Sequence, residues 1–134
     1  MRAALVEERG RGAELWLVSA TLDLLAEAVA RQLGFDRCLC TRLALARGRY
    51  TGLLAGPVCR GREKLHRVQA EPMAQGISID WPECSYYADG YEDLPLLEAV
   101  GRPVAVHPDE RLLKVAEARG WTRLGPARGH RSGG

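Results

Sequence analysis

The sequence has no long hydrophobic run and no segment of uniform charge. No stretch approaches the roughly 20 consecutive apolar residues that a membrane-spanning helix needs, and residues 1–9 carry acidic side chains where a secretory signal would have an apolar core. The 19 Lys and Arg are scattered among 17 Asp and Glu, so there is no basic stripe for nucleic acid or anionic lipid. We therefore expect a cytoplasmic protein that binds neither nucleic acid nor membrane.

Standard cysteine motifs are also missing. The four cysteines include a Cys-x-Cys pair but no Cys-x-x-Cys, and their spacing matches no common zinc site. They are Cys38, Cys40, Cys59 and Cys84. Buried free thiols are the simpler interpretation, since reduced cysteine behaves as a small hydrophobic residue.

The composition is that of one globular domain. Of the 134 residues, 46% are hydrophobic and 27% are charged, which allows a real core to form in a single domain. We place that domain at residues 1–124. Residues 125–134 are rich in glycine and arginine, and we expect them to form a flexible tail.

Strand and helix patterns alternate along the chain. Short apolar runs predict strands at 13–18, 37–40, 84–88 and 103–106, and a hairpin at 43–54. Helical spacing, with glycine or proline near the ends, predicts helices at 1–9, 21–33, 93–100 and 108–119, and one that begins near 61 and is ended or kinked at Pro72. The alternation predicts an α/β fold with a mostly parallel sheet, whose ligands bind beyond the carboxyl ends of the strands.

Three predicted strands end in polar or flexible residues, namely Ser19, Asp89-Gly90 and His107. The hydroxyl of Ser19 and the amides of Ala20 and Thr21 could together hold a phosphate oxygen at the start of the following helix. The alternative is that Ser19 or Thr21 only caps that helix. No histidine is paired in the sequence with a plausible nucleophile, so we do not expect histidine catalysis.

Charged residues near two predicted helix starts suggest a metal and an anion. Asp89 and Asp93 lie four residues apart across a strand-to-helix loop, an arrangement that suits Mg²⁺; the alternative is that Asp93 caps the helix at Leu94. Lys64 lies in a first helical turn, where a cation opposes the helix dipole. It either neutralises a bound anion or is simply solvated.

Together, Leu17-Val-Ser-Ala-Thr21, Gly61-Arg-Glu-Lys64 and Tyr87–Gly101 resemble, in order and spacing, the later motifs of haloacid-dehalogenase-like (HAD) phosphatases. The most similar branch is the phosphoserine-phosphatase-like type IB, and the resemblance covers residues 1–124. Its specific part is the run Asp-x-x-x-Asp-Leu-Pro-Leu-Leu-Glu-x-Val-Gly from Asp89. The resemblance implies a Rossmann-like core, Mg²⁺ and a small phosphomonoester substrate.

The resemblance also implies a role for each candidate residue. Ser19, with Ala20 beside it, would bind the phosphoryl oxygens, and Lys64 would neutralise the charge of nucleophile and phosphate. Asp89 would ligate Mg²⁺, and Asp93 would support that ligation. The family's nucleophile is the first aspartate of an Asp-x-Asp-x-Thr motif.

This chain departs from the family because it contains no Asp-x-Asp. We expect the nucleophile-bearing first strand and the cap to lie upstream of Met1, so that the chain is truncated relative to the family. Either the strands that end at Ser19 and Asp89 then close up to the spacing of paired strands, about 4.8 Å, or a partner chain or a second copy completes the sheet between them. Two functions stay open: a phosphomonoesterase part that is inactive alone, or a non-catalytic module that binds phosphate, metal or another protein.

Overall fold

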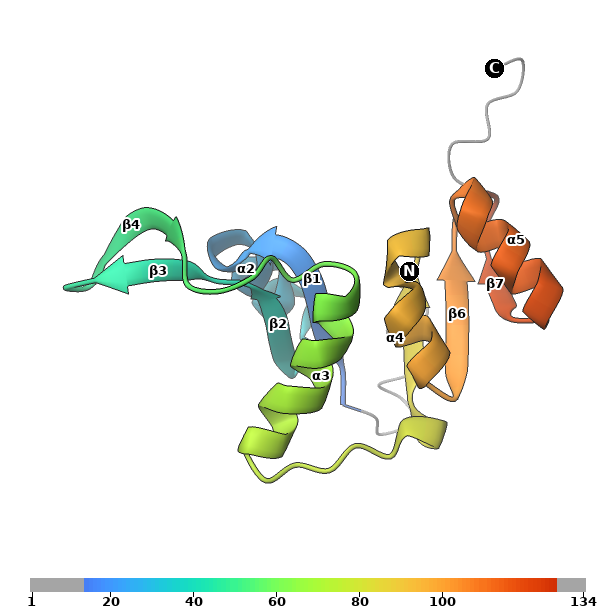
Figure 1. The fold of residues 1–134 in the computed structure, drawn as a ribbon, viewed down its shortest axis with the longest axis horizontal. Coiled ribbons are helices and arrows are strands. Elements are labelled where there is room, and N and C mark those ends of the chain that lie inside the picture. Colours follow the sequence, from blue (N-terminus) through green and yellow to red (C-terminus); the bar gives the residue numbers. More distant parts are fainter. Residues whose placement is uncertain (1–13, 128–134) are drawn as a thin grey trace, which may run out of the picture. The chain divides into compact units, whose positions relative to one another are not determined.

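The computed structural model describes residues 14–127, and the predicted helix at 1–9 and the end of the predicted tail lie outside them. The chain forms two compact units, residues 1–68 and 69–134. Each contains parallel strands joined through helices, as Figure 1 shows. The predicted α/β class with parallel sheets, flanking helices and a small hairpin is confirmed.

The first unit is built on a strand–helix–strand motif of β1 (Trp16–Leu22), α2 (Asp23–Leu33) and β2 (Arg37–Thr41). The strands β1 and β2 pair in parallel. Ala26 and Ala30 are the buried apolar residues of α2, and such small side chains let a helix lie close to its neighbours. The helix ends at Gly34, whose φ of 77° is the left-handed conformation that glycine adopts without strain.

A hairpin follows directly. It consists of β3 (Leu43–Ala46) and β4 (Arg49–Leu54), which pair antiparallel. The two turn residues, Arg47 and Gly48, have φ of 53° and 76°, and this pair of positive angles is typical of a type I′ turn. The hairpin predicted for residues 43–54 is therefore confirmed.

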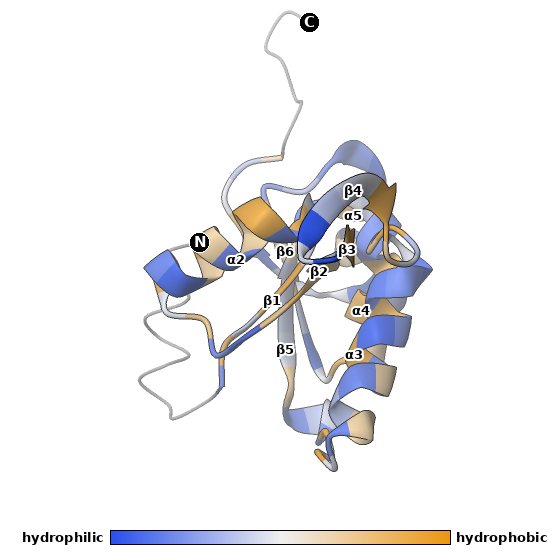
Figure 2. Ribbon diagram, turned by 90° about the vertical axis from the view of Figure 1, so that its left-hand side faces the viewer, coloured by the Kyte–Doolittle hydropathy of each residue, from blue (hydrophilic) through white to orange (hydrophobic). Residues whose placement is uncertain are grey.

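Helix α3 (Arg62–Ala74) has few apolar residues, and Figure 2 shows it mostly in the hydrophilic colours. Pro72 lies inside its last turn, and the helix ends two residues later. The amide of Gly76 then donates to the carbonyl of Met73 at 3.0 Å. The helix thus continues past Pro72 and ends within the same turn, close to the end that the sequence predicts.

The second unit is a three-stranded parallel sheet in the order β5-β6-β7. Its elements are η1 (Trp81–Glu83), β5 (Ser85–Ala88), η2 (Tyr91–Asp93), α4 (Leu94–Ala99), β6 (Arg102–Val106), α5 (Glu110–Arg119) and β7 (Thr122–Leu124). The hydrophobic core contains Ala88, Leu97, Ala105, Leu112 and Ala116, and Trp121 packs against it.

Several boundaries differ from the prediction. Strand β1 continues to Leu22 and α2 begins at Asp23, not Thr21, because Leu22 is still extended and pairs with Thr41. Helix α5 begins at Glu110, not Pro108, because the Asp109 carboxylate accepts from the Leu112 amide as an N-cap. Strand β7 was not predicted at all; its three residues are exposed and carry no hydrophobic pattern.

Candidate functional site

The segment around Ser19 differs from its predicted geometry. The pairing of β1 with β2 is irregular between Val18 and Leu22, and there the Ser19 hydroxyl accepts a hydrogen bond from the Thr21 amide at 3.0 Å. Leu22 holds the N-cap position of α2 without any side-chain cap. The strand therefore does not end at Ser19, neither Ser19 nor Thr21 caps the helix, and the amide of Thr21 is already used. Ser19 and Ala20 are half-buried in this irregular part of β1.

Lys64 lies in the first turn of α3, as predicted, but it is only 9% exposed. The interpretation of a solvated lysine is therefore wrong. A buried ammonium group is stable only among polar or charged groups that replace its water. The sequence predicted the position of Lys64 but not its burial.

Asp89 directly follows β5, whose last residue, Ala88, is buried. Asp89 itself is exposed. Asp93 lies one 3-10 turn further along, and its amide donates to the carbonyl of Gly90 at 3.0 Å. The structure therefore holds Asp89 and Asp93 on one short loop at the carboxyl end of a parallel strand, where α/β folds bind their ligands.

The carboxylate of Asp93 is buried, with 6% of the residue exposed. Asp93 occupies the N-cap position of α4, yet its side chain makes no capping hydrogen bond. Its Oδ2 instead accepts from the hydroxyl of Tyr86 at 3.3 Å. The interpretation that Asp93 merely caps the helix is therefore wrong, because its side chain makes no hydrogen bond to the first amides of α4.

The predicted site residues fall into two groups by unit. Ser19, Ala20 and Lys64 belong to the first unit, and Asp89 and Asp93 belong to the second. Within the second unit the two aspartates share a loop.

Comparison with protein families identifies the chain. The model of the haloacid dehalogenase-like hydrolases matches residues 1–98. The chain belongs to this family. Among the described residues of this HAD chain, no helix is long and apolar enough to cross a membrane.

Individual relatives agree with the family match. Phosphoserine phosphatase SerB1 of Mycobacterium tuberculosis is 38% identical over 110 residues, which are 82% of this chain and 35% of the relative. A solved structure of a Bordetella pertussis protein with unknown function has a TM-score of 0.87 and 32% identity, covering 92% of this chain and 56% of that one. A probable phosphoserine phosphatase from Vibrio cholerae shares the fold, with a TM-score of 0.69 and 21% identity over 90% of this chain and 36% of that one.

The HAD chain spans about a third of the length of two curated relatives from Mycobacterium, 35% and 36%. The family resemblance implies Mg²⁺ and an aspartate nucleophile at the site. The donor atoms of this chain bear on the metal, and its lack of an Asp-x-Asp motif bears on the nucleophile.

The donor atoms of the HAD chain fit a hard cation that keeps most of its water. Within residues 14–127, no group of three or more His, Cys, Asp or Glu side chains is arranged to hold a metal ion. The loop between β5 and α4 carries three carboxylates, Asp89, Glu92 and Asp93, of which Asp89 and Asp93 are the candidate ligands. Mg²⁺ is commonly bound by one or two carboxylates together with waters and phosphate oxygens. The donor set therefore fits Mg²⁺ better than a metal that needs a full protein cage.

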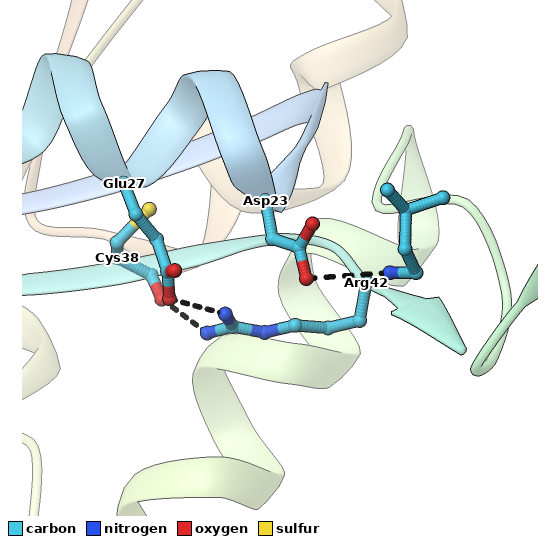
Figure 3. A network of polar contacts seen from close by, with 5 residues as sticks. Asp23, Glu27, Cys38 and Arg42 are labelled. Carbon is cyan, nitrogen blue, oxygen red and sulfur yellow. Dashed lines mark hydrogen bonds and ion pairs between the residues drawn. The ribbon is translucent and has the colours of Figure 1, made fainter. Parts of the chain in front are cut away.

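A polar network at the end of β2 was not predicted from the sequence (Figure 3). Arg42 forms an ion pair with Glu27 of α2 and donates to the carbonyl of Cys38 at 3.1 Å. The hydrogen bond to Glu27 raises the pKa of the Arg42 guanidinium. Asp23, which is 9% exposed, accepts from the amide of Leu43 at 3.3 Å. The network thus fixes the start of the hairpin to α2.

The cysteines are free thiols, as predicted. Cys40 and Cys59 are fully buried. Burial raises the pKa of Cys38 to about 12 and also raises the pKa of Cys40. Because the thiolate is the reactive form of cysteine, these two thiols are poor nucleophiles near neutral pH.

Proposed function

We propose that this chain carries the phosphate- and metal-binding residues of a phosphoserine-phosphatase-like hydrolase of small phosphomonoesters, and that it does not hydrolyse them alone. The observation that carries the proposal is the loop after β5. It pairs the exposed Asp89 with Asp93, a buried carboxylate that does not cap its helix. Together the two side chains supply carboxylate oxygens, which are the ligands that Mg²⁺ prefers in proteins, at the carboxyl end of a parallel strand.

Each candidate residue has a role in this proposal. Asp89 ligates Mg²⁺ and Asp93 supports that ligation, while Mg²⁺ would stabilise the charge on the transferred phosphoryl group. Ser19 and the backbone at Ala20 bind phosphoryl oxygens. Lys64, which is buried in the first turn of α3, offsets the negative charge that gathers around the phosphate. The similarity to SerB1 supports these roles.

The expected lack of activity follows from the missing nucleophile. The chain contains no Asp-x-Asp, and Asp23 and Asp109 are both engaged in local hydrogen bonds. Removing one member of a catalytic unit can lower the rate by on the order of 10⁶. The nucleophile would come from a partner chain that itself carries the Asp-x-Asp motif, because a second copy of this sequence lacks the motif as well.

A second candidate function is a non-catalytic module that binds phosphate or Mg²⁺. One observation favours it: the sequence lacks the nucleophile motif, while Asp93 is still a buried acid. Such a module would keep its affinity for the ion without any turnover. The two functions therefore differ in whether a partner chain that supplies the nucleophile produces phosphate-ester hydrolysis.

The test is hydrolysis of an aryl phosphate by the purified chain, with and without Mg²⁺, alone and in the presence of cell extract fractions from the source organism. Asp89→Asn is the variant, because it keeps the shape of the side chain and removes its charge. We expect no turnover by the chain alone, and Mg²⁺-dependent turnover that Asp89→Asn lacks when a partner supplies the nucleophile. Turnover by the chain alone that Asp89→Asn abolishes would contradict the proposed inactivity and require a nucleophile elsewhere in the chain.

A further inference from the structure

The loop from Asp89 to Asp93 is tied to the start of helix α5. The amide of Asp109 donates to the carbonyl of Asp89 at 2.9 Å. The Oδ2 atom of Asp109 accepts from the amide of Tyr91, also at 2.9 Å. The guanidinium of Arg111 lies over the Tyr91 ring, 3.8 Å from its centroid. Three contacts from one helical turn therefore hold one short loop.

The two hydrogen bonds from Asp109 are placed on either side of Gly90. Glycine has more backbone freedom than any other residue, so this is the point at which the loop would move most easily. One bond fixes the carbonyl that precedes Gly90 and the other fixes the amide that follows it. The direction in which Asp89 leaves the strand is therefore set by Asp109.

Asp109 is itself held firmly. Its second carboxylate oxygen, Oδ1, accepts from the Leu112 amide at 2.8 Å, so the same side chain caps α5. Leu112 and Ala116 anchor that helix in the core of the unit with no exposed surface. The position of the loop is thus linked to the most buried part of the second unit.

We propose that Asp109 is a positioning residue: it fixes the loop that carries Asp89 and Asp93 in the orientation that binds Mg²⁺. The inference rests on the proposed function of that loop. Asp109 does not ligate the ion, because both of its carboxylate oxygens accept backbone hydrogen bonds. It acts through Asp89 and Tyr91.

Asp109→Ser separates the two roles of the residue. Serine is a good N-cap and can keep the bond to Leu112, but its single, shorter hydroxyl cannot also reach Tyr91. Glu110→Gln is the matched control, because it removes one negative charge from the same helical turn. The side chain of Glu110 is exposed, and its ion pair is with Lys114 on α5 itself.

Two measurements test the proposal. The first is amide hydrogen exchange at Tyr91, which does not depend on any metal. In Asp109→Ser we expect exchange to accelerate on the order of 10-fold, because one charge-assisted hydrogen bond is lost, while the amides of α5 stay protected. The second is calorimetric titration with Mg²⁺ in inorganic phosphate. We expect about a 10-fold loss of affinity in Asp109→Ser and none in Glu110→Gln.

Three results would overturn the proposal. Unchanged exchange at Tyr91 in Asp109→Ser would show that Asp109 does not hold the loop. Faster exchange with unchanged Mg²⁺ affinity would show that the tie is structural only. If the wild-type chain binds no Mg²⁺, the metal site of the proposed function fails together with the positioning role, while the exchange result still reports on the tie itself.

Discussion

Replacing Leu112 by alanine should destabilise the second unit strongly. Leu112 has no exposed surface, and its neighbours in the core include Ala88, Ala105 and Ala116. These side chains are too small to fill the space that three missing carbon atoms leave, and two of them lie on strands whose pairing restricts their movement. Buried Leu→Ala substitutions lower the free energy of unfolding by about 2–5 kcal/mol. For Leu112 we expect about 3 kcal/mol or more.

Urea unfolding followed by the indole N–H signals in NMR measures this effect in each unit separately. Trp121 packs on the core that contains Leu112, whereas Trp16 lies in the first unit. We take an m-value of about 1 kcal/mol/M for so small a unit. The urea concentration at the midpoint of unfolding, as reported by the Trp121 signal, should then fall by about 3 M, or the unit should already be unfolded in water. The control is Met73→Ala, whose side chain is 75% exposed and which should change stability by less than about 0.5 kcal/mol. A midpoint at Trp121 that moves no more than in this control would refute the packing argument.

Three further predictions concern the packing of Gly101, the hydroxyl of Tyr86 and the thiol of Cys38. Gly101→Ala should lower the free energy of unfolding by about 1–3 kcal/mol or more, because the added Cβ would lie 1.9 Å from the backbone oxygen of Pro82 in η1. Gly56→Ala is the control, because a Cβ there meets no atom within 4 Å. Equal melting temperatures for the two variants would contradict the prediction. Tyr86→Phe should cost about 1 kcal/mol in urea unfolding, because it removes the hydroxyl that donates to Asp93, and no loss would mean that this bond is weak in solution. Burial raises the pKa of Cys38 from 9.0 to about 12, so on raising the pH the Cys38 thiol ionises in the unfolded chain before it ionises in the folded chain. The contribution of this thiol to stability is therefore full below pH 9 and is lost as the pH rises towards 12. Thiolate absorbance that rises at the same pH in folded and denatured chain would rule this out.

The elements that the sequence predicted well are those with local determinants. Gly34 and Gly120 end α2 and α5 in the left-handed conformation, and Arg47-Gly48 forms the hairpin turn. Each is a short-range preference of the backbone that a sequence pattern records. Strand β7 was missed because its three exposed residues gain their structure only by pairing with β6.

For the candidate site residues, the sequence indicated the strand end at Asp89 but not the strand end after Leu22 or the environment of the side chains. A polar residue after an apolar strand was enough to place Asp89, since the strand end is a local feature. The burial of Asp93 and Lys64 depends on residues distant in sequence, and no pattern records it. The tie between Asp109 and Tyr91 joins residues 18 apart. An aspartate at position 109, directly before α5, is a common N-cap residue, but the sequence does not indicate that the same carboxylate also holds another loop.

The most direct test of the proposed site is calorimetric titration of Mg²⁺ into the chain in the presence and absence of inorganic phosphate. The variants are Asp89→Asn and, as a control from the same loop, Glu92→Gln, which removes the same charge from a residue outside the proposed ligand set. We predict saturable Mg²⁺ binding that phosphate strengthens, that Asp89→Asn abolishes and that Glu92→Gln retains. Equal binding by all three proteins, or no binding by the wild-type chain, would contradict the assignment of this loop as the metal site.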